Sequence, residues 1–150
     1  MATVYLSLGS NLGDRLENIT EALVFIAKKV GDVTKVSDFY ETMPWGFYSK
    51  SKFLNVAAEV VTNLQPLNLL SITQEIEKEI GRKEKSVNGV YKDRMIDIDI
   101  LFYEHQIIES PDLTIPHPLL HKRQFVLQPL AEIAPDFVHP VLKKTIRELA

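Results

Sequence analysis

The sequence contains no cysteine, which excludes disulfide bridges and metal sites built from thiolates. Its apolar runs fall well short of the length that a membrane-spanning helix requires. The start of the chain, residues 1–8, is too short for a signal peptide, because the turn formers Gly9, Ser10 and Asn11 interrupt it. These absences favour a soluble protein of the reducing cytoplasm that has no membrane partner.

An excess of positive charge is also missing. Lysine and arginine number 17 and aspartate and glutamate number 20, which leaves a formal net charge of −3. Such a chain has no overall basic field, so a nucleic-acid partner held by attraction to the phosphate backbone is not expected. Any site for a polyanion must therefore be local.

Apolar sequence, by contrast, is sufficient for one hydrophobic core. The chain has 150 residues, of which 45% are hydrophobic, a size and composition typical of one domain. We therefore expect residues 1–150 to form a single domain.

The order of apolar patterns predicts the fold class. Apolar alternation, helical spacing and turn formers mark six elements in the order strand, helix, strand, strand, helix, strand. Their ranges are 3–8, 12–30 with Gly31 as a C-cap, 33–42, 53–62, 66–81 and 94–103. This order predicts an α+β, ferredoxin-like split βαβ fold with a mainly antiparallel sheet and both helices on one face. An extended piece at 113–118 and helices at 125–133 and 142–150 could cover the other face, so that helices lie on both faces.

Two acids, Asp97 and Asp99, stand one residue apart within the otherwise apolar run 94–103. Alternate side chains of a strand point the same way, so both carboxylates leave one face about 6.6 Å apart while Ile96, Ile98 and Ile100 enter the core. Two anions so placed repel each other unless a cation lies between them. Carboxylate oxygens suit Mg²⁺, which takes further ligands from water and substrate phosphates. The alternative is an exposed strand face with ordinary acids.

Basic residues surround these acids in the sequence. They are Arg82, Lys83, Lys85, Lys92 and Arg94 before the acids, and His117, His121, Lys122 and Arg123 after them. A triphosphate with Mg²⁺ would be a common partner, because carboxylates hold the metal and guanidinium forks bind phosphate oxygens. The alternative is a solvated loop with surface ion pairs, each worth roughly 0 to 1 kcal/mol, and it suits the run 83–85. Arg94 precedes Asp97 by three residues and is expected near the metal.

A second group of candidates comprises Phe53 and Asn55, which share one face of the strand 53–62. Asparagine is uncommon inside strands, and its amide can read the edge of a flat heterocycle while an aromatic ring covers the face. The alternative is a core phenylalanine beside a satisfied asparagine. His117, between Pro116 and Pro118, has a stiff extended backbone that suits a contact to phosphate, although a lone histidine is more often a plain surface residue.

Several short motifs, read together, resemble those of a known family. They are 8–13 (LGSNLG), 39–42 (FYET), 53–55 (FLN), 81–82 (GR), Arg94 with 97–101 (DIDIL), 116–127 (PHPLLHKRQFVL) and 129–135 (PLAEIAP). In this order and spacing they resemble the 6-hydroxymethyl-7,8-dihydropterin pyrophosphokinases. The resemblance implies an enzyme of folate biosynthesis that transfers pyrophosphate from ATP to the pterin hydroxymethyl group and releases AMP.

The resemblance also implies roles for particular residues. Asp97 and Asp99 would bind two Mg²⁺ ions that clamp the ATP phosphates, and Arg82 and Arg94 would assist phosphate binding and transfer. Further nucleotide contacts would come from Gln74, Glu77, Ile100, Thr114, His117 and Arg123. The pterin would contact Thr42, Met43, Pro44, Trp45, Phe53, Asn55 and Phe125. ATP and the pterin are the expected partners, and the chain is expected to act as a monomer.

Two stretches depart from the family pattern. Residues 91–93 (YKD) stand where an aromatic residue, glycine and proline usually precede the arginine, and Glu84 stands where a basic residue is common. Lys83, Lys85 or Lys92 are then the candidates for the basic contact to ATP.

Two other functions remain compatible with the same residues. A ferredoxin-like regulatory module would bind a small ligand without consuming it and would not need paired acids. Another Mg²⁺-dependent nucleotidyl- or phosphotransferase could use Asp97 and Asp99 but would release pyrophosphate or ADP. The nucleotide product separates these alternatives.

Overall fold

The computed structural model describes residues 1–42, 52–81 and 95–150. Its elements, in chain order, are β1 (Ala2–Ser10), α1 (Arg15–Lys29), β2 (Gly31–Val36), β3 (Tyr40–Thr42), β4 (Phe53–Thr62), α2 (Pro66–Gly81), β5 (Asp97–Tyr103), β6 (Ile108–Glu109), β7 (Thr114–Ile115), a 3-10 helix at Leu120–Lys122, α3 (Gln124–Ile133) and α4 (Ile146–Leu149). Within these described ranges, none of the helices has both the length and the apolarity that crossing a lipid bilayer requires.

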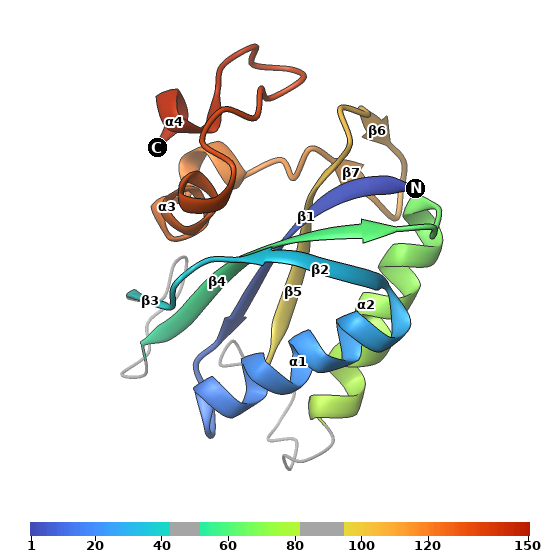
Figure 1. Cartoon of the computed structure of the whole chain (residues 1–150), viewed down its shortest axis with the longest axis vertical. Coiled ribbons are helices and arrows are strands. Elements are labelled where there is room, and N and C mark those ends of the chain that lie inside the picture. The colour runs from blue at the N-terminus through green and yellow to red at the C-terminus, as the bar shows by residue number, and fades with distance from the viewer. Residues whose placement is uncertain (43–51, 82–94) are drawn as a thin grey trace.

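The main sheet has the strand order β2-β4-β1-β5, and every pairing in it is antiparallel. The short strand β3 continues the path of β2 along the same neighbour, β4. β1 and β2, joined by α1, are thus separated in the sheet by β4, and β5 lies on the far side of β1 (Figure 1). This is the split βαβ arrangement that the order of patterns predicts.

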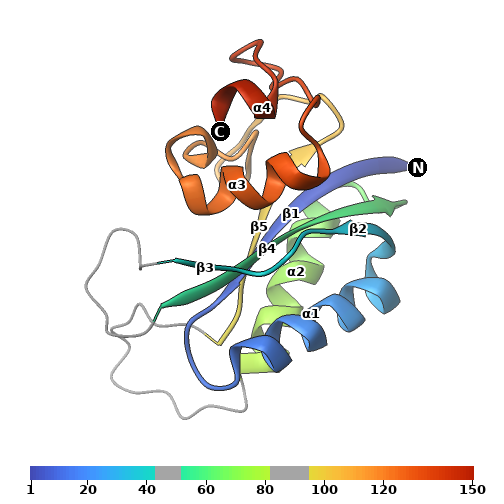
Figure 2. The same cartoon turned by 60° about the vertical axis from the view of Figure 1, so that its left-hand side comes forward.

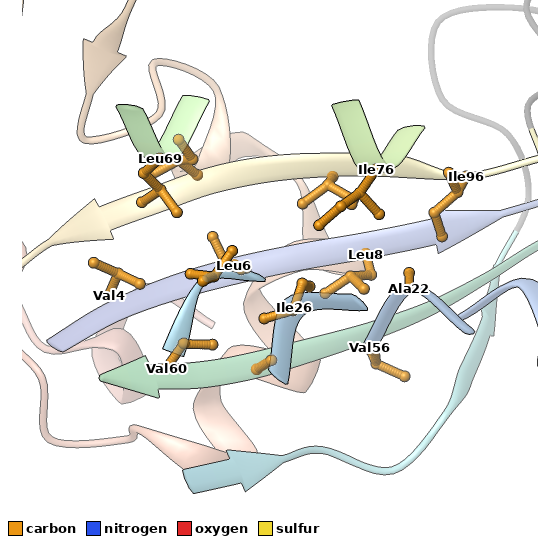
Figure 3. Packing of buried hydrophobic residues seen from close by; sticks show 14 of the residues in the cluster. Val4, Leu6, Leu8, Ala22, Ile26, Val56, Val60, Leu69, Ile76 and Ile96 are labelled. Atoms are coloured by element: carbon orange, nitrogen blue, oxygen red, sulfur yellow. The ribbon is translucent and has the colours of Figure 1, made fainter. Parts of the chain in front are cut away.

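Helices cover both faces of the sheet, as expected. α1 and α2 lie on the first face, and α3 and α4 lie on the second (Figure 2). The first core is built from β1 side chains such as Leu6 and Leu8, which meet Ile26 of α1 and Ile76 of α2 (Figure 3). These four side chains are fully buried, and each contributes roughly 1.5–3 kcal/mol relative to exposure. The second core contains Phe102 and the apolar side of α3.

An irregularity in β5 separates the polar half of this strand from its apolar half. Leu6 pairs with Ile100 and Tyr5 pairs with Phe102, so Leu101 has no partner across the ladder. Leu101 and Phe102 therefore both enter the second core, whereas Tyr103 enters the first. A bulge of this kind re-aims side chains without ending the strand.

The predicted strand 33–42 is wrong in detail, because it is two strands. Ser37 interrupts it: its backbone N–H donates to Ala57 O at 2.9 Å, and its side-chain oxygen accepts from Ala57 N at 2.9 Å. A side chain thus takes the place of a backbone carbonyl in the ladder, and the chain bends before Tyr40 starts β3.

The predicted helix 12–30 is shorter than its apolar spacing suggests. Asp14 is the N-cap, and its side chain accepts from Glu17 N at 3.1 Å, so the helix begins at Arg15. Val30 is the C-cap, and the expected C-cap Gly31 is instead the first residue of β2. A Cβ at Gly31 would lie 2.0 Å from Val61 O, so close approach of two strands explains this glycine.

At the C-terminus, the predicted helix 142–150 is also too long. Only Ile146–Leu149 is helical, and it begins at a capping box in which Thr145 and Glu148 bond reciprocally. The helix predicted at 125–133 is confirmed as α3, with Pro129 inside it.

His139 organises the loop between α3 and α4. The residue is 4% exposed, and its Nδ1 accepts from Val141 N and Leu142 N, both at 3.1 Å. Its ring meets the Phe102 ring edge-on at 5.5 Å between centroids. Burial, and secondarily the nearby His121, lowers the pKa of His139, so the native state favours the neutral ring.

We predict that this histidine makes stability depend on pH. Unfolded His139 takes up a proton at about pH 6.5, whereas the native ring resists it, so its stabilising contribution is complete above that pH and is lost as the pH falls towards the lower native pKa. His139→Asn keeps an acceptor near the position of Nδ1 and removes the titration. Urea unfolding at pH 7.5 and 5.5 should show a smaller loss of stability in the variant than in the wild type. An equal loss in both proteins would contradict the prediction.

Candidate functional site

Polar residues of three strands meet at one end of the second face of the sheet. The ladder places Gly9 of β1 between Asn55 of β4 and Asp97 of β5. One pleat further along, Ser7 pairs with Asp99. Neighbouring strands lie about 4.8 Å apart, so the Asp97 and Asn55 backbones are about 10 Å apart with Gly9 between them. These two small residues, Ser7 and Gly9, form what we call the floor of the candidate site, between the acids and the amide.

The two acids point as the alternation predicts. Ile96, Ile98 and Ile100 belong to the first core, and the half-exposed Asp97 and Asp99 lie on the opposite face. This prediction is confirmed. The acids therefore have access to solvent and to any ligand on the face that α3 partly covers.

Two basic side chains approach Asp99. Its Oδ2 lies 3.9 Å from His117 Nε2 and 4.0 Å from Arg123 Nη1, and the three side chains are 30%, 20% and 17% exposed. His117 follows β7, and Arg123 is the N-cap residue of α3. Residues distant in sequence thus form one polar group, in which both separations are longer than a direct hydrogen bond.

His117 is held in a defined orientation. Its backbone N–H donates to Leu101 O at 3.1 Å, and its Nδ1 accepts from Leu119 N at 3.2 Å. Burial, and next the Arg123 charge, lowers the pKa of His117, against an opposing effect of Asp97. Because Nδ1 accepts a bond, the neutral ring carries its proton on Nε2, which lies 3.9 Å from Asp99 Oδ2 and can donate to a ligand.

The amide of Asn55 is also fixed. The residue is 2% exposed, and its Nδ2 donates to Thr42 Oγ1 at 2.8 Å. A Cβ at Gly9 would lie 2.9 Å from Asn55 Oδ1 and 3.4 Å from Phe53 Cδ1. The missing side chain at Gly9 therefore makes the space that this amide and this ring occupy.

The start of α3 adds a second aromatic ring to this face. The Arg123 guanidinium lies 5.6 Å from the centroid of the Phe125 ring, a cation–π distance. Phe125 packs against the second core, on the face of the sheet that also carries Phe53 and Asn55. The structure thus brings Arg123 and Phe125 to the same end of the molecule as Asp99.

The residues predicted to contact the nucleoside are distributed around β5. Glu77 Oε2 accepts from Ile98 N at 2.7 Å, which ties α2 to this strand. The Ile100 side chain is buried in the first core, so only its backbone could meet a ligand. Gln74 on α2 and Thr114 on β7 are exposed. Glu77 is thus the predicted nucleoside contact for which the structure gives a bond to β5.

Some predicted site residues lie outside the described residues. They are Arg82, Arg94, Met43, Pro44 and Trp45, together with Lys83, Glu84, Lys85, Tyr91 and Lys92. The roles suggested for them stay predictions.

The donor set near Asp99 fits Mg²⁺. The described parts of the chain hold no group of three or more histidine, aspartate or glutamate side chains able to ligate a metal. Asp97 and Asp99 offer carboxylates on one face, and Mg²⁺ commonly uses one or two carboxylates and completes its shell with water and phosphate oxygens. The residues present therefore match a metal that is held jointly with a phosphate ligand.

Sequence reasoning assigned no role to Ser7, and it wrongly interpreted Gly9 as a turn former that ends the strand 3–8, whereas β1 continues to Ser10. Both are small residues within β1, where they alternate with Leu6 and Leu8. A row of small side chains on one face of a central strand is a signal of close approach by another group, and it could have indicated the floor.

A family model and two curated proteins are similar to this chain. The model described as 7,8-dihydro-6-hydroxymethylpterin-pyrophosphokinase matches residues 5–135. A 2-amino-4-hydroxy-6-hydroxymethyldihydropteridine pyrophosphokinase of Porphyromonas gingivalis is 50% identical over 141 residues, which cover 93% of this chain and 95% of that protein. A protein of the same name from Aquifex aeolicus is 43% identical over 148 residues, covering 99% and 90%.

Solved structures show the same fold. A crystal structure of the HPPK-DHPS protein of Plasmodium falciparum superposes with a TM-score of 0.79 at 20% identity. The match covers 99% of this chain and 44% of that longer chain.

We predict that Gly9→Ala displaces the Asn55 side chain. The new Cβ would stand 2.9 Å from Asn55 Oδ1, so the amide must move and its bond to Thr42 must weaken. Overpacking of this kind costs about 1–3 kcal/mol of unfolding free energy. Urea unfolding and the side-chain amide signals of Asn55 in ¹H–¹⁵N spectra measure both effects.

Gly81→Ala is the matched control, because no described atom lies within 4 Å of a Cβ at Gly81. Unchanged Asn55 signals in Gly9→Ala would show that the floor tolerates a methyl group, against the prediction.

Proposed function

Because this chain belongs to the 7,8-dihydro-6-hydroxymethylpterin-pyrophosphokinase family, we propose that this end of the sheet is its active site. The chain is an ATP- and Mg²⁺-dependent enzyme of folate biosynthesis. It transfers pyrophosphate from ATP to the hydroxymethyl group of 6-hydroxymethyl-7,8-dihydropterin, giving AMP and the pterin pyrophosphate. Family membership decides against a regulatory module and against a transferase with another nucleotide product.

The grouping around Asp99 is the observation that carries the site assignment. His117 and Arg123 reach within 3.9 and 4.0 Å of its carboxylate, and Asp97 lies on the same face. Two acids and two side chains able to bind phosphate match a ligand that carries both signs of charge, and a Mg²⁺-bound triphosphate is such a ligand. In our proposal Asp97 and Asp99 ligate two Mg²⁺ ions, with the remaining ligands from phosphates and water.

Bound Mg²⁺ neutralises phosphate charge and lowers the pKa of a coordinated hydroxyl. The protein residues supply placement. Arg123 presents N–H donors in a fork that matches phosphate oxygens, and neutral His117 presents a single Nε2–H. Asp97 serves first as a metal ligand, and we assign it no role as a general base.

The pterin, in this proposal, lies over the floor of the candidate site, at Gly9. One N–H of Asn55 donates to Thr42 Oγ1, which orients Oδ1 toward the space over Gly9, where it would accept a hydrogen bond from the heterocycle edge. Phe53 and Phe125 would cover the two faces of the ring. The predicted contacts of Met43, Pro44 and Trp45 complete this site in the proposal.

The nucleoside would lie along β5. Ile100 would act through its backbone, flanked by Gln74, Glu77 and Thr114. Glu77 would have to keep or exchange its bond to Ile98 N when the base binds.

For the transfer itself we propose in-line attack of the pterin hydroxyl oxygen on the β-phosphorus of ATP, with AMP as the leaving group. The pterin oxygen forms a bond to the β-phosphorus, the bond from this phosphorus to the α,β-bridging oxygen breaks, and AMP leaves with that oxygen. The hydroxyl proton passes to water. Arg82 and Arg94 would stabilise the transferring oxygens, and arginine contacts of this kind are worth about 10³ to 10⁵ in rate. We further propose that residues 1–150 act as one monomeric domain in the cytoplasm.

We predict that Asp97→Asn and Asp99→Asn each lower kcat by on the order of 10³-fold, because a lost metal ligand removes several kcal/mol of charge stabilisation. Chromatographic detection of AMP formation measures the rate and identifies the product. Calorimetric titration with Mg²⁺ and a non-hydrolysable ATP analogue should show weaker binding in both variants.

Asp32→Asn is the control, because Asp32 is an exposed acid of β2, at the opposite edge of the sheet. Near-normal turnover in either site variant, or ADP in place of AMP, would contradict the proposed roles.

A further inference from the structure

Glu132, next to the last residue of α3, joins this helix to the sheet. Its carboxylate accepts from Asp38 N at 2.9 and 3.2 Å and from the Tyr40 hydroxyl at 2.7 Å. The bond to Glu132 raises the pKa of Tyr40 to about 12, so the hydroxyl remains a donor at neutral pH. One side chain thus holds both the bend before β3 and the first residue of β3.

β3 is part of the proposed pterin site. Among the described residues, its other side-chain attachments are the ion pairs of Glu41 with Arg15 at 2.8 Å and with Lys52 at 4.0 Å, and the bond from Asn55 to Thr42. The strand has three residues and pairs with β4 alone, with Tyr40 opposite Asn55 and Thr42 opposite Phe53. A strand this short is held weakly by its ladder. In Figure 2, β3 continues the line of β2, and α3 lies above these strands. The attachment to α3 through Glu132 therefore bears directly on where Thr42 stands.

The same helix carries the other side of the site. Phe125 and Glu132 lie seven residues apart in α3, so they share one side of the helix and are separated by about 10 Å along its axis. Arg123 precedes this helix as its N-cap. A contact at Glu132 thus limits rotation and sliding of α3, and both movements would shift Phe125.

We propose that Glu132 is a positioning residue that sets the distance between Phe125 on α3 and the Thr42–Asn55 pair on β3 and β4, and thereby sets the affinity for the pterin. This inference rests on the proposed function, because the proposed function assigns these residues to the pterin. Glu132 touches neither substrate in this proposal and acts only through the two elements that it joins.

Three variants test the proposal. Tyr40→Phe removes one hydrogen bond at the surface and should raise the pterin KM about three- to tenfold. Glu132→Ala removes all the bonds and should raise it further, whereas Glu132→Gln keeps an acceptor oxygen and should restore much of the affinity. The KM for ATP should rise less than the KM for the pterin, because Asp97, Asp99 and His117 do not belong to α3 and only Arg123, its N-cap, moves with the helix.

Tyr5→Phe is the matched control. The Tyr5 hydroxyl donates to Glu59 Oε2 at 2.7 Å, which is also a tyrosine–glutamate bond. Tyr5 precedes Gly9 by four residues in β1, which is roughly 13 Å along the strand. This variant should leave the pterin KM unchanged. Amide hydrogen exchange at Asp38, faster in Glu132→Ala than in the wild type, reports loss of the contact independently of catalysis.

An unchanged pterin KM in Glu132→Ala, despite faster exchange at Asp38, would overturn the inference. Equal rises in the KM values for ATP and the pterin would also overturn it, because they indicate a general structural effect. Phe125→Ala distinguishes failure of the positioning role from failure of the proposed function. Wild-type pterin affinity in Phe125→Ala would contradict the pterin site of the proposed function. Weakened pterin affinity in Phe125→Ala, together with unchanged pterin affinity in Glu132→Ala, would refute only the positioning role.

Discussion

The antiparallel pairing of β1 with both β4 and β5 is the constraint on which the candidate site depends. It sets Gly9 between Asp97 and Asn55, so acids and amide face each other across a residue without a side chain. A slip of one residue would turn both acids into the apolar layer and the isoleucines outward. Leu6 and Leu8, fully buried against the two N-terminal helices, oppose such a slip. The first core thus maintains the chemistry of the second face.

The candidate site on the second face is built from two sets of residues, one on the sheet and one at the start of α3. The sheet supplies residues whose positions are fixed by ladder hydrogen bonds, namely the two acids, Ser7, Gly9 and Asn55. The start of α3 and the segment before it supply the donors Arg123 and His117, which reach Asp99. Substrates that carry phosphate at one end and a flat ring at the other match this layout. Because the two sets come from separate layers, the contacts that hold α3 to the sheet matter for the site.

The fold was predictable where a local pattern had one reading. Helix α2, with Leu69, Ile76 and Ile80 on its buried side, begins and ends where the sequence predicts. Strand β5 follows its alternation as far as Ile100. The break between β2 and β3 was not predictable, because Ser37 pairs through its hydroxyl with Ala57, a residue 20 positions away. Gly31 was misread for the same reason, since the carbonyl that excludes a Cβ there belongs to β4.

The candidate site divides in the same way. Residue order alone established that Asp97 and Asp99 share a face, that Phe53 and Asn55 share another strand face, and that the motifs match the pyrophosphokinase family, because alternation and motif spacing are properties of a local stretch. Only the tertiary structure decided that Gly9 separates the acids from the amide, that Arg123 and His117 converge on Asp99, and that Glu132 joins α3 to β3. These relations depend on strand register and on how a helix lies over a sheet, and both are set by packing between residues far apart in the chain.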